Sequence, residues 1–98
     1  MEKRNVVAII VDKRSDVSVT LQKLFTGWGC MIKTRLGIHE GILDHCTQTG
    51  LIILEMVGEL KKIKEFVRKL NLINGVKANY LSLELPKPKK TKSEKNEL

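Results

Sequence analysis

The sequence has little of what marks a disulfide scaffold, a membrane protein or a disordered chain. Its 98 residues include only 2 Cys and 2 Pro, and 42% of them are hydrophobic. Cys30 and Cys46 stand 16 positions apart, which favours two free thiols over a small disulfide-stapled fold. The apolar run near the N-terminus, Val6 to Val11, has six residues, whereas a membrane span needs about 20. These absences predict one folded cytoplasmic domain without a membrane segment.

Positive charge is concentrated toward the end of the chain. Residues 1–85 carry 13 Lys and Arg against 9 Asp and Glu, while residues 86–98 carry 5 Lys against 2 Glu. The last segment has no apolar residue before Leu98, so burial cannot offset the entropy lost on ordering it. We therefore predict a folded domain over residues 1–85 and a disordered basic tail over residues 86–98. Such a tail either solubilises the protein or contacts DNA phosphates. The lysines for that contact are Lys87, Lys89, Lys90 and Lys92.

Apolar spacing along the chain predicts two helices and four strands. Apolar residues recur at helical spacing in two segments and form short β-branched or alternating runs in four others. The predicted elements are, in order, strand 5–12, helix 17–28, strand 30–38, strand 51–57, helix 58–70 and strand 76–85. This βαββαβ order is typical of the ferredoxin-like fold. Right-handed crossovers then place both helices on one face of a four-stranded antiparallel sheet, an α+β fold with the first and third strands at its centre.

The two central strands are apolar on both of their faces. Apolar side chains occupy the odd and the even positions of the runs 6–11 and 51–54, while helices cover only one face of the sheet. The uncovered face needs another partner. We therefore expect a homodimer or homotetramer that associates through the sheet. The neighbouring strand, over 30–38, is expected to place Ile32, Thr34 and Leu36 on one face.

Potential metal ligands gather in the long connection between the second and third strands. The connection contains His39, Glu40, Asp44, His45 and Cys46. Imidazole and thiolate groups suit Zn, Ni, Cu or Fe, although the spacing matches none of the strong metal motifs. An ordinary polar loop explains the same residues within one subunit. A transition metal shared between subunits, held by His39, His45 and Cys46, is the functional alternative.

Catalytic motifs are missing from the sequence. It contains no nucleophile elbow, no Walker A loop and no glycine-rich dinucleotide fingerprint after a strand, so we expect no enzymatic activity. Glu55 interrupts a central strand, and its carboxylate is expected to pair with Arg35 or Lys33 on the neighbouring strand. Cys30 is expected to be a small buried residue rather than a reactive thiol.

Four stretches together resemble a known family. They are MEKR before the first strand, Arg35 to Ile38, Gly50 to Gly58, and Asn74 to Lys77. Over residues 2–85 the chain resembles the iron-only hydrogenase system regulators, which look like stand-alone ACT-like domains similar to the C-terminal domain of the nickel-responsive regulator. It has no counterpart of the ribbon-helix-helix segment with which that regulator binds DNA.

The resemblance implies a regulatory role with an effector bound where subunits meet. In such domains the effector lies near the turn after the first strand and the facing strand, which here implies a site made of Asp12, Lys13, Arg14, Ser15 and Gly37. The effector would be an amino acid or a transition metal. The expected function is therefore a non-catalytic regulatory module that oligomerises through its sheet. The alternatives are an adaptor that docks a partner protein without a small ligand, and weak nucleic-acid binding through the basic tail.

Overall fold

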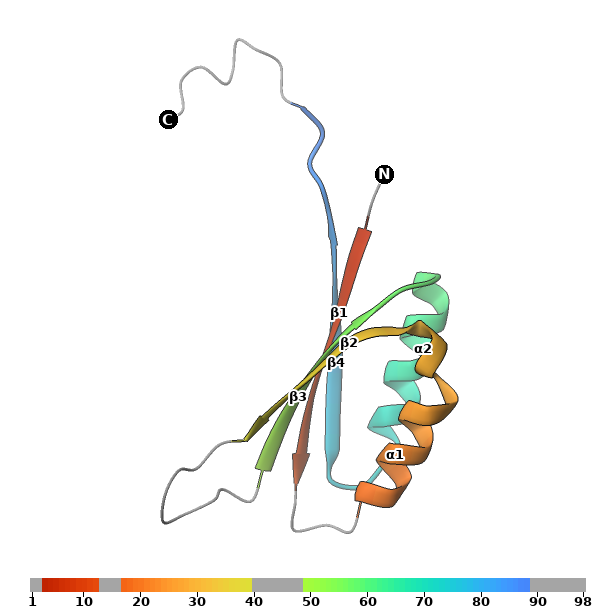
Figure 1. Ribbon diagram of the computed structural model, residues 1–98, viewed down its shortest axis with the longest axis vertical. Coiled ribbons are helices and arrows are strands. Elements are labelled where there is room, and N and C mark those ends of the chain that lie inside the picture. Colours follow the sequence, from red (N-terminus) through yellow and green to blue (C-terminus); the bar gives the residue numbers. More distant parts are fainter. Residues whose placement is uncertain (1–2, 13–16, 40–48, 89–98) are drawn as a thin grey trace.

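The computed structural model describes residues 3–12, 17–39 and 49–88. For residues 38 and 39 it describes the backbone but not the side chains. Four strands and two helices follow one another in the predicted βαββαβ order. The strands are β1 (Lys3–Asp12), β2 (Ile32–His39), β3 (Thr49–Met56) and β4 (Val76–Glu84), and the helices are α1 (Ser18–Gly27) and α2 (Leu60–Asn71). Both helices lie on the same side of the sheet (Figure 1). Neither described helix is long and apolar enough to span a membrane.

The sheet has the ferredoxin-like strand order that the sequence predicts. Its four strands lie in the order β2-β3-β1-β4, and every neighbouring pair is antiparallel. The two most apolar strands, β1 and β3, are therefore central. Ile9 on β1 faces Ile52 on β3 and Ala78 on β4, so one row of side chains runs across three strands beneath the helices.

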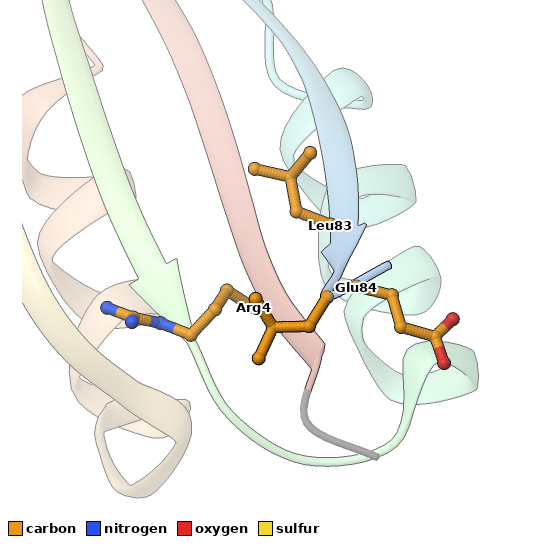
Figure 2. A pocket seen from close by; sticks show the side chains of 4 residues that line it. Arg4, Leu83 and Glu84 are labelled. Atoms are coloured by element: carbon orange, nitrogen blue, oxygen red, sulfur yellow. The ribbon is translucent and has the colours of Figure 1, made fainter. Parts of the chain in front are cut away.

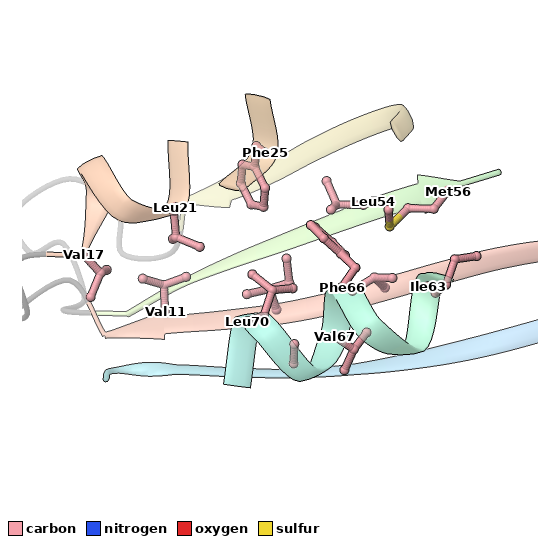
Figure 3. Packing of buried hydrophobic residues seen from close by; sticks show 13 residues of the cluster. Val11, Val17, Leu21, Phe25, Leu54, Met56, Ile63, Phe66, Val67 and Leu70 are labelled. Atoms are coloured by element: carbon pink, nitrogen blue, oxygen red, sulfur yellow. The ribbon is translucent and has the colours of Figure 1, made fainter. Parts of the chain in front are cut away.

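The core fills the space between the sheet and the helices (Figure 3). Val7, Ile9 and Leu54 are completely buried from the sheet side, and Ile63 and Leu70 are completely buried from α2. The inward stripe of α2 therefore agrees with the helical period in the sequence. Burial of each such side chain stabilises the fold by about 1.5–3 kcal/mol.

Three aromatic rings close the core between the two helices. Phe66 on α2 is completely buried, and its ring centroid lies 6.3 Å from that of Phe25 and 5.2 Å from that of Trp28. The rings are tilted by 40° and 49°, and both centroid distances lie in the range over which aromatic rings attract each other. The aromatic residues of the first helical segment thus serve packing.

A short 3₁₀ helix, η1 (Gly29–Met31), separates α1 from β2. The N–H of Met31 donates to the carbonyl of Trp28 (2.9 Å), and the N–H of Val57 donates to the carbonyl of Met31 (2.8 Å). Cys30 lies in this turn and is an exposed free thiol, so the expectation of a buried cysteine was wrong. The reason is that the strand begins two residues later than its apolar pattern suggests, which leaves Cys30 on the surface.

The register of β2 shifts between Ile32 and Thr34. Ile32 faces Met56 and packs against the core, whereas Thr34 faces Glu55 on the other side of the sheet. The prediction that Ile32 shares a face with Thr34 and Leu36 was therefore wrong. An irregularity of this kind interrupts the two-residue alternation on which the prediction rested.

The turn between α2 and β4 depends on a glycine. Gly75 has φ of +85°, a conformation that residues with a β-carbon rarely adopt. Its carbonyl accepts a hydrogen bond from the N–H of Asp12 (2.7 Å), which ties the turn to the end of β1. After β4, residues 85–88 follow without regular structure, and residues 89–98, with Lys89, Lys90 and Lys92, lie outside the described part of the chain.

Candidate functional site

The face of the sheet opposite the helices is the main candidate surface. Val7 and Leu54 face each other and are buried under the helices. Because side chains alternate along a strand, Val6 and Glu55 point to the other side. We call that side the open face. It comprises Arg4, Val6, Ala8 and Ile10 on β1, Thr34 and Leu36 on β2, Leu51, Ile53 and Glu55 on β3, and Lys77, Asn79, Leu81 and Leu83 on β4.

Apolar side chains dominate the open face. Its exposed large ones are Ile10 (48%), Leu36 (55%), Leu81 (57%) and Leu83 (52%). Across the middle of the sheet, Leu36, Ile53 and Ala8 are paired neighbours on three adjacent strands. A single exposed leucine is ordinary on a protein surface, whereas a contiguous apolar patch marks a site of interaction. The open face therefore has the character of an interface.

An ion pair crosses one end of the open face. Nε of Arg4 contacts Oε2 of Glu55, and Nη2 of Arg4 donates to Oε1 of Glu55 at 2.9 Å. This hydrogen bond from Arg4 lowers the pKa of Glu55, with the positive charges of Arg4 and Lys33 adding to the effect and desolvation opposing it. Glu55 thus stays ionised within an apolar surface.

The expectation that Glu55 pairs with Arg35 or Lys33 was wrong. Arg35 faces Leu54 and lies on the helix side of β2, where its guanidinium stands 4.7 Å from the centroid of the Phe25 ring. Lys33 acts on Glu55 only through its charge. The partner is Arg4, which lies on β1, 51 positions from Glu55 in sequence. No local pattern in the sequence connects these two residues.

A shallow pocket of about 270 Å³ lies beside this ion pair. It is lined by Arg4, Leu83, Glu84 and Leu85. Figure 2 shows Arg4 extending over the end of β3, with Glu84 pointing away from Leu83. The lining is mostly apolar, and Arg4 and Leu83 belong to the open face, so the pocket adjoins that face.

The outer edge of β4 is closed by asparagine side chains. Nδ2 of Asn71, the last residue of α2, donates to the carbonyl of Ala78 (3.0 Å), and the N–H of Ala78 donates to Oδ1 of Asn71 (2.7 Å). The N–H of Tyr80 donates to Oδ1 of Asn79 (2.9 Å). A strand added at this edge would need the same backbone groups. The middle of the outer edge of β4 is therefore blocked to an added strand. The sequence analysis did not identify the role of Asn71.

The residues predicted to bind an effector are only partly described. Asp12 ends β1 and faces Thr49 at the start of β3, while Gly37 on β2 faces Ile52. A Cβ atom at Gly37 would meet no atom within 4 Å, so there is space beside its backbone. Lys13, Arg14 and Ser15 lie outside the described residues, and the effector site stays a prediction.

The predicted metal ligands also fall largely outside the described residues. The backbone of His39 pairs with Gly50 at the same end of the sheet as Asp12 and Thr49, while His45 and Cys46 are not described. Within residues 3–12, 17–39 and 49–88, no three His, Cys, Asp or Glu residues are grouped so as to hold a metal ion. The metal site with His45 and Cys46 therefore stays a prediction.

Comparison with known proteins shows similarity at the level of the fold. No family model matches the chain, and no curated protein matches it. The structure is similar to that of the uncharacterized protein TM1266 from Thermotoga maritima, with a TM-score of 0.70 and 20% sequence identity over 85% of this chain and 100% of that one. At this identity the similarity shows a shared ferredoxin-like fold.

Proposed function

We propose that the protein is a non-catalytic regulatory module that self-associates through its open face and responds to a small effector bound where the subunits meet. The observation that carries this proposal is the contiguous apolar surface formed by all four strands opposite the helices. A second copy of the chain suits it, because two such faces are complementary in hydrophobicity and two-fold dimers are the commonest assemblies.

The energetics suit a regulated equilibrium. Four Leu and Ile side chains of the open face are about half exposed, and burying the rest of each would contribute about 1 kcal/mol. Eight such side chains in a dimer contribute about 8 kcal/mol, which is comparable with the about 4–15 kcal/mol lost on association. The smaller apolar residues of the face add to this gain. The free energy gained by burial is therefore close to the free energy lost on association. An effector that binds the dimer more favourably than the monomer, by about 1–3 kcal/mol, shifts the association equilibrium.

The effector is proposed to bind at the end of the sheet where β1 finishes. Asp12 and the backbone of His39 lie at this end, on the two strands that flank β3. The resemblance to the iron-only hydrogenase system regulators supports an amino acid near Asp12, Lys13, Arg14, Ser15 and Gly37. It equally supports a transition metal, whose ligands in this chain would include His39, His45 and Cys46.

Measurement of the oligomeric state tests the proposal. Sedimentation velocity of the wild-type protein should show a dimer or tetramer that dissociates on dilution. Leu81→Lys places a charge in the open face and should weaken association at least about tenfold, or about 1.4 kcal/mol. The matched control is Leu72→Lys, because Leu72 follows α2 and is 70% exposed away from the open face. This control should associate like the wild type.

A monomeric wild-type protein at about 100 μM, a concentration at which micromolar association would be complete, contradicts self-association. A monomer whose open face instead captures another protein would be the adaptor considered above. Thermal shift against amino acids and divalent metal ions tests the effector separately, because a ligand that binds only the folded state raises the melting temperature. No shift with any of them contradicts the effector and leaves self-association standing.

A further inference from the structure

Helix α2 carries an unusual excess of positive charge. Its 12 residues, LKKIKEFVRKLN, include five basic residues and one acidic residue. The single carboxylate, on Glu65, is already paired with Arg68 (2.7 Å) and with Lys69 (3.8 Å). Within the described part of the chain, the three remaining cations have no acidic partner. They are Lys61, Lys62 and Lys64.

These cations all project from the outer surface of the molecule. The opposite side of α2 packs into the core through Ile63, Phe66 and Leu70, which are completely buried. Lys61 and Lys64 are separated by three positions, so they are neighbours on the exposed side of the helix. Lys62, between them in sequence, is exposed as well.

We propose that the outer surface of α2 binds the phosphate backbone of nucleic acid through Lys61, Lys62 and Lys64. Lysine ammonium groups without acidic partners neutralise phosphates and release the counterions condensed on them. A dimer joined through the open face leaves both α2 helices exposed, because the helices lie on the other side of the sheet (Figure 1). This surface is therefore independent of the proposed regulatory interface and adds a second function to it.

Two other classes of partner fit this surface less well. A membrane-bound amphipathic helix must insert its apolar side among the lipids, but the apolar side of α2 is buried in the core. Protein interfaces are depleted in lysine and enriched in aromatic residues, and the exposed side of α2 has no aromatic residue. Several exposed lysines without acidic partners instead suit the regularly spaced negative charges of a nucleic-acid backbone.

Fluorescence anisotropy with a labelled DNA duplex of about 20 base pairs tests this proposal. The wild-type protein should bind at about 50 mM salt and lose affinity steeply by about 200 mM. The double variant Lys61→Glu/Lys64→Glu should bind at least about tenfold more weakly, and the slope of log K against log salt should fall by about 2. Lys61→Ala/Lys64→Ala, which preserves helix propensity, should show a smaller loss in the same direction.

The matched control is Lys3→Glu/Lys23→Glu. It changes the net charge equally, but Lys3 lies on β1 and Lys23 on α1, both are exposed, and neither belongs to the open face. It should keep affinity within about twofold of the wild type, because it removes none of the proposed phosphate contacts. Circular dichroism confirms that each variant is folded.

Three results would overturn the proposal. The first is absence of wild-type binding at low salt, and the second is an equal loss of affinity in the α2 variant and in its control. The third is loss only when Lys87, Lys89, Lys90 and Lys92 are changed to serine, which would assign binding to the tail. None of these results bears on self-association, which sedimentation of the same samples reports separately.

Discussion

Replacement of Asn71 by alanine should destabilise the domain through the outer edge of β4. The side chain makes two hydrogen bonds with the backbone of Ala78, at 3.0 and 2.7 Å, and Ala78 is 4% exposed. Asn71→Ala leaves one N–H and one carbonyl without these partners, at a cost of about 1–3 kcal/mol. Alanine is a better helix former than asparagine by several tenths of a kcal/mol, which offsets part of the loss. We expect a net destabilisation of about 1–2 kcal/mol.

Thermal unfolding followed by circular dichroism measures this effect. For a domain of this size, about 1 kcal/mol lowers the melting temperature by about 4–8 °C. Asn79→Ala is the control, because Asn79 makes one exposed hydrogen bond, with the N–H of the next residue, and should change the melting temperature by less than half as much. Equal melting temperatures for the two variants would refute the reasoning. Asn71→Ala should also expose the strand edge and increase aggregation on heating.

Two further substitutions test other details of the structure. The hydrogen bond from Arg4 lowers the pKa of Glu55 from its ordinary 4.5, so the pair stabilises the folded state above that pH and loses its effect as the pH falls through the lowered pKa. Glu55→Gln should therefore lower the melting temperature at pH 7 but not near pH 2, and a pH-independent difference would contradict this. Gly58 has φ of +114°, and a Cβ atom there would lie 2.8 Å from Cε of Met31. Gly58→Ala should cost about 1–3 kcal/mol in urea unfolding, whereas Gly27→Ala, where a Cβ meets nothing within 4 Å, should be close to neutral.

Much of the fold could be predicted because its signals are local. The helical spacing of Leu60, Ile63, Val67 and Leu70 predicts the inward side of α2. The last three are buried and Leu60 is half-buried. The continuous apolar runs identified β1 and β3 as the central strands. Periodicity succeeds here because the geometry of a helix or a strand dictates which residues share a side, whatever they pack against.

Parts of the candidate site could not be predicted because they depend on pairing between distant segments. The irregularity in β2 moved Ile32 into the core. The partner of Glu55 is Arg4, although Arg35 and Lys33 were the residues expected. A change of one residue in register exchanges the faces of a strand, so small errors in pairing reassign many side chains.

The sequence by itself determined the order of elements, the inward stripe of α2 and the presence of apolar residues on both sides of the central strands. Only the tertiary structure decided that Arg4 meets Glu55, that Asn71 closes the edge of β4, and that Cys30 is exposed. The physical reason is that local patterns follow from backbone geometry, whereas contacts between elements follow from the register and packing of the whole sheet.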